Sequence, residues 1–113
     1  MKRLLVVNVL SSAEMDALLK AKWEGMKQTM LSGNTETALT YLVAASRDRY
    51  RQAFTSLGNR LSVIFSSISE FKVYKVYGSL AECGAIRIEN GTPYSYPVTF
   101  VQDENGMWRI LGF

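Results

Sequence analysis

The sequence has no histidine and one cysteine, Cys83, among its 113 residues. Without histidine, the Ser-His-Asp and Cys-His nucleophilic systems and every histidine-ligated metal site are excluded. A single cysteine cannot form a disulfide within the chain. No apolar run reaches the roughly 18 residues of a membrane-spanning helix, so we expect no transmembrane segment. The sequence also lacks glycine-rich phosphate loops and clusters of metal ligands, so we expect no cofactor and no metal.

The composition that remains is that of one ordinary globular domain. Hydrophobic residues make up 48% of the chain and charged residues 20%, which is too apolar for a disordered protein. The net charge is +3, and the densest basic cluster contains Arg47, Arg49, Arg51 and Arg60. Because Asp48 lies inside this cluster, we interpret it as a solvated helix face and find no strong nucleic-acid signal.

The first eleven residues differ from the rest of the chain. Two basic residues precede a short apolar run from Leu4 to Leu10, and small residues follow it, as in a signal peptide. The run lies at the bottom of the ~7–15-residue range of such regions and is interrupted by Asn8. We therefore favour a short strand or the tail of a preceding segment over residues 1–11, followed by a single domain over residues 12–113.

Helical periodicity extends from residue 13 to residue 68. A capping box from Ser11 to Glu14 opens an expected helix over residues 13–31, which ends before Gly33. Asn34 caps a second helix, whose apolar positions continue to residue 45. A third helix follows Ser46 as far as residue 57. The Gly-Asn pair at residues 58–59 then favours a separate fourth helix rather than a kink.

After residue 68 the periodicity changes to that of strands. We expect four strands, over residues 71–77, 81–88, 94–101 and 107–113, joined by short turns that include Asn90-Gly91. Pro93 and Pro97 donate no ladder hydrogen bond, so the third strand should have an edge, a bulge or an irregular start. Short turns produce an antiparallel meander, and helices followed by strands indicate an α+β fold with the helices on one sheet face.

Three segments carry a resemblance to a known superfamily. Trp23, Met26 and the run from Gly33 to Leu39 (GNTETAL) resemble the opening of nuclear transport factor 2-like domains, and residues 96–110 resemble their last hairpin. The resemblance covers roughly residues 14–113 and implies a cystatin-like cone, with N-terminal helices packed on a curved four-stranded antiparallel meander. The motif at residues 46–50 (SRDRY) is closest to bacterial domains of unknown function. That resemblance implies a parent multidomain envelope protein and a location in the cell envelope or outside the cell.

Strand alternation defines two candidate faces on the second strand. Ala81, Cys83, Ala85 and Arg87 share one face, and the residues between them share the other. The alternation does not settle which face is inward, but the resemblance favours the first and carries Arg87 to the mouth of the cone. There Arg87 could hold a carboxylate or phosphate by a bidentate pair. Alternatively, it pairs with a neighbouring Glu or lies at a rim.

Two sets of residues are candidates for function. The ligand-pocket candidates are Arg87, Tyr50, Tyr77, Tyr96 and Cys83, in which the tyrosines supply ring area and hydroxyls and the cysteine acts as a small buried hydrophobe. The dimer-face candidates are Ile86, Ile88, Met107 and Leu111. These four could form the exposed apolar patch that a homodimer needs, unless residues 4–10 cover it.

The function that we expect is non-catalytic. The chain would be a binding or protein-interaction domain that holds a small anionic or amphipathic ligand in the cone and dimerises through the sheet. The alternative is an isomerase- or dehydratase-like enzyme, because the resemblance includes enzymes that use a buried acid with tyrosine. Asp16, Asp48 and Asp103 have structural roles at helix starts or in a turn. Alternation leaves open whether Glu82 and Glu89 face inward.

Overall fold

The computed structural model describes residues 12–113. The expected tail or strand over residues 1–11 lies outside this range. The helices are α1 (Ser12–Leu31), α2 (Thr35–Leu39), α3 (Arg47–Leu57) and α4 (Arg60–Ser66), with a 3-10 turn at Ala44–Ser46. The strands are β1 (Ile68–Tyr77), β2 (Leu80–Glu89), β3 (Thr92–Gln102) and β4 (Trp108–Gly112), in one antiparallel sheet of order β1-β2-β3-β4. The α+β prediction and the meander are therefore confirmed.

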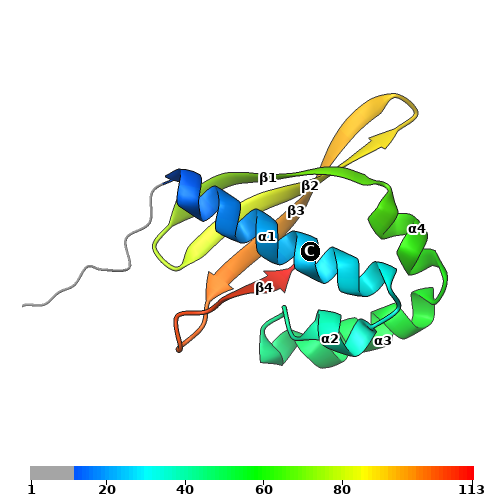
Figure 1. Ribbon diagram of the computed structural model, residues 1–113, viewed down its shortest axis with the longest axis horizontal. Helices are drawn as coiled ribbons and strands as arrows, with labels where there is room; N and C mark the ends of the chain where they lie inside the picture. The colour runs from blue at the N-terminus through cyan, green and yellow to red at the C-terminus, as the bar shows by residue number, and fades with distance from the viewer. Residues whose placement is uncertain (1–11) are drawn as a thin grey trace, which may run out of the picture.

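Helix α1 lies across the sheet, whereas α2, α3 and α4 gather around one end of α1 (Figure 1). The tip of the β2–β3 hairpin extends beyond the helices. Leu19, Trp23 and Met26 of α1 are almost completely buried, in the same core as Ala81 and Phe100 from the sheet. Burial of large apolar side chains such as these stabilises the fold by roughly 1.5–3 kcal/mol each.

The inward face of β2 is the one that carries Ala81, Cys83 and Ala85, all three of which are buried. Each of these residues lies opposite an inward residue of β3; Ala81, for example, pairs with Phe100. The small side chains leave room for the larger ones of α1 and β3. Arg87 follows them on the same face, so the strand alternation also brings this charged side chain to the helical side of the sheet.

The second helix, α2, is shorter than its periodicity predicts: it ends at Leu39, whereas the apolar positions continue to residue 45. The chain then turns and runs beside β4: Val43 N–H donates to Ile110 O at 2.9 Å, and Ile110 N–H donates to Tyr41 O at 2.8 Å. Leu42 forms a parallel bridge with Ile110, and both side chains are fully buried. Pairing with a strand far away in the sequence therefore overrides the local helical pattern.

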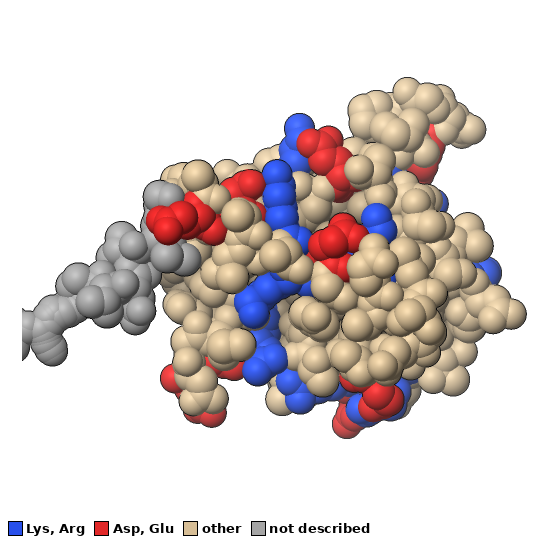
Figure 2. Space-filling model, in the orientation of Figure 1, with Lys and Arg blue, Asp and Glu red and all other residues tan. Residues whose placement is uncertain are grey.

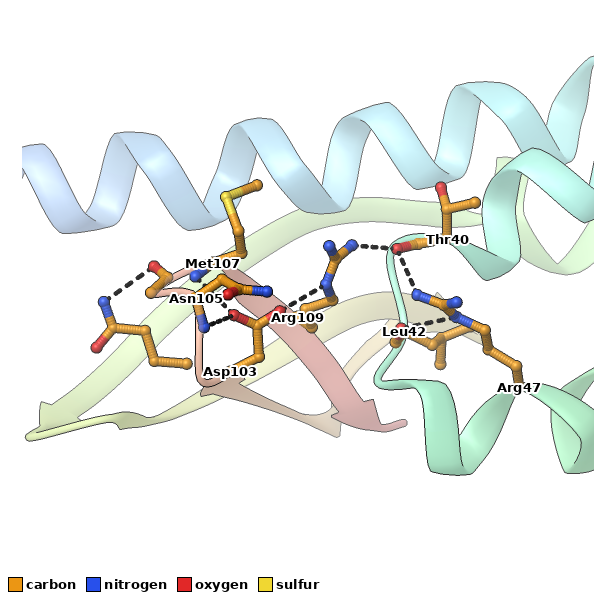
Figure 3. A network of polar contacts seen from close by, with 9 residues as sticks. Thr40, Leu42, Arg47, Asp103, Asn105, Met107 and Arg109 are labelled. Carbon is orange, nitrogen blue, oxygen red and sulfur yellow. Dashed lines mark hydrogen bonds and ion pairs between the residues drawn. The ribbon is translucent and has the colours of Figure 1, made fainter.

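Two arginines fasten this connection (Figure 3). Arg109 Nη1 donates to Thr40 O at 2.6 Å, and Arg47 Nε donates to Leu42 O at 3.2 Å. Arg109 Nε also donates to Asp103 Oδ2 at 3.1 Å. The pKa of Asp103 is lowered, mainly because its carboxylate accepts the backbone N–H of Met107, with further help from Arg109. This network ties the β3–β4 turn to the segment after α2.

Two other boundaries follow from local chemistry. Helices α3 and α4 are separate, as predicted, and Gly58 between them has a φ of +52°, which favours glycine. Ile68 belongs to β1 rather than to the preceding helix, since it pairs with Arg87 of β2.

Strand β4 pairs with β3 only from Thr99 to Gln102. The part of β3 that contains Pro93 and Pro97 is therefore an edge, where a missing N–H donor costs nothing.

Candidate functional site

A cavity of about 220 Å³ lies between helices α3 and α4 and the inner face of β2 and β3. Its lining is almost entirely apolar and aromatic. The lining residues are Trp23, Phe54, Leu57, Leu61, Ile64, Phe65, Ile68, Ala85, Arg87, Tyr96, Pro97, Val98 and Phe113. Concave apolar sites with a few polar groups are the usual form of small-molecule binding sites.

Phe113 forms an aromatic wall of this cavity. Its ring packs edge-on against Trp23, with the centroids 5.6 Å apart, and against Phe65 at 6.1 Å. On its other side it stacks on Tyr50 at 4.8 Å. Contacts of this kind contribute beyond their buried area, so the wall joins α1, α3 and α4 to the residue that follows β4.

Arg87 is the one charged residue among the described residues that line the cavity. Its side chain is 33% exposed, and Nη1 lies 3.7 Å from Glu89 Oε2. Its Nε is shielded from water and has no hydrogen-bond partner within residues 12–113. A buried donor without an acceptor costs about 1–3 kcal/mol. The cavity therefore has a cationic group whose hydrogen-bonding capacity is only partly used.

Tyr96 supplies a second polar group next to Arg87. Its hydroxyl donates to Glu89 Oε2 at 2.5 Å. The hydrogen bond to this carboxylate raises the pKa of Tyr96. The phenol acts as a hydrogen-bond donor to Glu89.

The β2–β3 turn positions these three side chains. Asn90 and Gly91 have φ values of +53° and +81°, so both central residues of the two-residue turn are left-handed, as in the tightest hairpins. This turn sets Glu89 opposite Thr92 and Ala85 opposite Tyr96. Because facing residues project from the same side of a sheet, Glu89, Arg87 and Tyr96 all lie on the inward face.

The other three predicted pocket residues do not line the cavity. Tyr50 packs behind its Phe113 wall, to which its hydroxyl is hydrogen-bonded. Cys83 is buried in the core, and desolvation raises the pKa of its thiol to about 12. Tyr77 donates its hydroxyl to Glu82 Oε2 at 2.7 Å, away from the cavity.

Sequence reasoning missed most of the cavity wall. The residues that it treated only as helix stripes, Phe54, Leu57 and Leu61, form one side of the cavity, and Phe113 forms another. Helical periodicity marks such residues as apolar but does not say whether a space remains between them. The part played by Glu89 could have been found from strand alternation, since it is two residues from Arg87 on the same face.

The four dimer-face candidates lie at different places on the sheet. Ile88, Met107 and Leu111 are exposed, and Ile86 is half-buried. Ile88 lies opposite Pro93, whereas Met107 adjoins the end of β3 at Gln102. Pro93 and Gln102 are nine residues apart on β3, which corresponds to roughly 30 Å along the strand. Dimerisation through the sheet stays a prediction, and light scattering that shows a strict monomer at high concentration would contradict it.

In the basic cluster, the three arginines on α3 contact the protein's own groups: Arg47 and Arg51 through hydrogen bonds, and Arg49 through the ring of Tyr50. Arg51 donates to both oxygens of Glu36, at 2.9 and 3.1 Å, and to Asp48 at 2.6 Å. In Figure 2 most of the visible face is neither acidic nor basic, and acidic and basic atoms lie side by side in several places. Within the described range, no group of three or more acidic or cysteine side chains could hold a metal ion, and no helix has the length and apolar character needed to cross a membrane.

Comparison of the chain with known protein families, with curated proteins and with solved structures finds no match. The assignment of function therefore depends on the cavity itself and on the groups at its polar end.

Proposed function

We propose that this chain is a non-catalytic binding domain whose cavity holds a small amphipathic carboxylate, with the apolar part inside and the carboxylate at Arg87. The observation that carries the proposal is the position of Arg87. An otherwise apolar cavity has a guanidinium with an unpaired Nε–H at one end. A guanidinium binds carboxylates strongly, because two parallel N–H groups match the two oxygens.

The size of the cavity restricts the ligand. A cavity of about 150 Å³ can hold benzene. The cavity of about 220 Å³ therefore suits a short alkyl chain or a single ring. Its aromatic walls favour such a group, since burial of apolar area contributes about 25 cal/mol per Å².

Binding has more support than catalysis in this cavity. A proton-transfer enzyme would need a carboxylate that reaches the substrate. The described lining residues include neither Asp nor Glu, and Glu89, which contacts the lining residues Arg87 and Tyr96, is already bonded to the Tyr96 hydroxyl. We therefore base the proposal on recognition of the ligand and assign no residue a catalytic role.

Isothermal titration calorimetry with octanoate and 1-octanol tests the proposal. The two probes have the same chain and differ in the head group. We expect the protein to bind octanoate more tightly than 1-octanol, and Arg87→Gln to abolish that preference. The matched control is Lys72→Gln, which removes a positive charge from an exposed residue of β1 opposite Gly84.

Two results would overturn the proposal. If neither probe shows saturable binding at millimolar concentration, the cavity is not a site for this class of ligand. If both probes bind but Arg87→Gln leaves the preference for octanoate intact, the carboxylate is not held by Arg87.

A further inference from the structure

We propose that Glu89 is an internal occupant of the anion position, which a ligand's carboxylate must displace in order to bind. This inference rests on the proposed function and concerns the same end of the cavity. It gives Glu89 a defined effect: it lowers the affinity of the site for acids without lowering the affinity for neutral amphipathic molecules.

A single oxygen of Glu89 contacts both Tyr96 and Arg87. Oε2 accepts the Tyr96 hydroxyl at 2.5 Å and lies 3.7 Å from Arg87 Nη1. A guanidinium and a phenol that converge on one carboxylate oxygen are the donors that a ligand's carboxylate would use. The protein thus places an acid of its own at its anion-binding groups and leaves Arg87 Nε without a partner.

The contact between Glu89 and Arg87 is weak enough to be replaced. At 3.7 Å it is longer than a charge-assisted hydrogen bond, which measures about 2.7–2.9 Å. About a third of each side chain is exposed, and ion pairs in such surroundings contribute little. Glu89 also leaves Arg87 Nε without a partner. A bidentate ligand can therefore make more hydrogen bonds to Arg87 than Glu89 does.

The location of Glu89 lets it leave. It is the last residue of β2, directly before the Asn90-Gly91 turn, at the end of the hairpin that extends past the helices (Figure 1). A change of side-chain rotamer there carries the carboxylate into water without moving the backbone. The Tyr96 hydroxyl and the guanidinium are then both available to the ligand.

Charge makes displacement necessary for an acid but not for a neutral ligand. With Glu89 in place, an entering carboxylate would share one guanidinium with a second negative charge, and like charges at close range repel each other. An alcohol adds no charge and can enter while Glu89 stays bonded to Tyr96. Removal of the Glu89 charge should therefore favour acids selectively.

The experiment compares two matched substitutions in the full chain. Glu89→Gln removes the charge at the cavity, and Glu82→Gln removes it from the Tyr77–Glu82 pair, a second Glu–Tyr hydrogen bond on the same sheet but outside the cavity. By calorimetry, we expect Glu89→Gln to bind octanoate about fivefold more tightly and 1-octanol unchanged. Glu82→Gln should leave both affinities at the wild-type value.

A second measurement detects the displacement directly. In the wild-type protein with ¹³C-labelled glutamate, octanoate should shift the Glu89 carboxyl resonance, and 1-octanol should not. The Glu82 resonance should stay in place with either probe. This readout requires no substitution, so it does not depend on how well a variant folds.

The outcomes separate this inference from the proposed function. If wild type prefers octanoate but Glu89→Gln binds it equally or less tightly, Glu89 supports the site rather than competing for it, and the inference is wrong while the proposed function stands. If the Glu89 resonance does not respond to bound octanoate, the inference fails in the same way. If wild type binds neither probe, the proposed function fails first.

Discussion

The hydroxyl of Tyr50 binds both main-chain groups of Phe113: it accepts the Phe113 N–H at 2.9 Å and donates to the Phe113 carbonyl oxygen at 3.1 Å. The two rings stack on each other at a centroid distance of 4.8 Å. Tyr50 lies on α3, whereas Phe113 follows β4. This pair of hydrogen bonds therefore holds the aromatic wall of the cavity against the helices.

Tyr50→Phe should remove both hydrogen bonds and keep the ring stack. We expect the free energy of unfolding to fall by about 1–2 kcal/mol, since one hydrogen bond contributes roughly 0.5–1.5 kcal/mol. Urea denaturation measures the change. Tyr94→Phe is the control, because Tyr94 is an exposed tyrosine on β3. Equal stability of the two variants would show that the Tyr50 hydroxyl does not fasten Phe113.

Two exposed side chains, Tyr74 and Ser95, cross over Gly84. The Tyr74 hydroxyl and Ser95 Oγ are 2.7 Å apart and form a hydrogen bond over Gly84. A Cβ at residue 84 would overlap Ser95 Oγ and would lie 2.7 Å from Tyr74 Cε2. We expect Gly84→Ala to lower the free energy of unfolding by about 1 kcal/mol, because the hydrogen bond between Tyr74 and Ser95 must open to admit the added Cβ.

A double-mutant cycle checks the cause of the Gly84 effect. Tyr74→Ala removes one of the crowding side chains, so the added methyl group at residue 84 should cost less in that background than in the wild type. Denaturant unfolding of the two single variants and the double variant measures the difference. If the costs simply add, the destabilisation comes from Ser95 or from the backbone of β2 and not from Tyr74.

Cys83 should make stability depend on pH in the alkaline range. Burial raises the pKa of its thiol from 9.0 to about 12, with a smaller effect from the negative charge of Asp16. The folded state therefore holds the thiol proton more firmly than the unfolded state does. This contribution is fully present below pH 9 and is lost as the pH rises from 9 towards 12.

Urea denaturation at several pH values between 8 and 11 measures this loss. Tyr77 and Tyr96 also have raised pKa values and act in the same direction, so the informative quantity is the difference between wild type and Cys83→Ala. Stability of the variant should fall less steeply with pH. Parallel curves would mean that Cys83 does not titrate differently in the two states.

The sequence by itself determined the order of the elements and most turns. Capping residues, helical periodicity, the change to strand alternation and the Asn90-Gly91 turn all act over a few residues, so they are visible without the fold. Strand alternation also grouped Arg87 with Ala81, Cys83 and Ala85. The resemblance to bacterial domains of unknown function favoured this group as the inward face, and the burial of Ala81, Cys83 and Ala85 confirms that orientation.

Only the tertiary structure decided what depends on contacts between distant segments. Helix α2 ends at Leu39 because Leu42 pairs with Ile110, and Tyr50 meets Phe113 across 63 residues of sequence. No local pattern encodes such pairings, since their free energy comes from burial and hydrogen bonds that form when the sheet and the helices pack together. The cavity, and the meeting of Arg87, Glu89 and Tyr96 at its rim, follow from that packing.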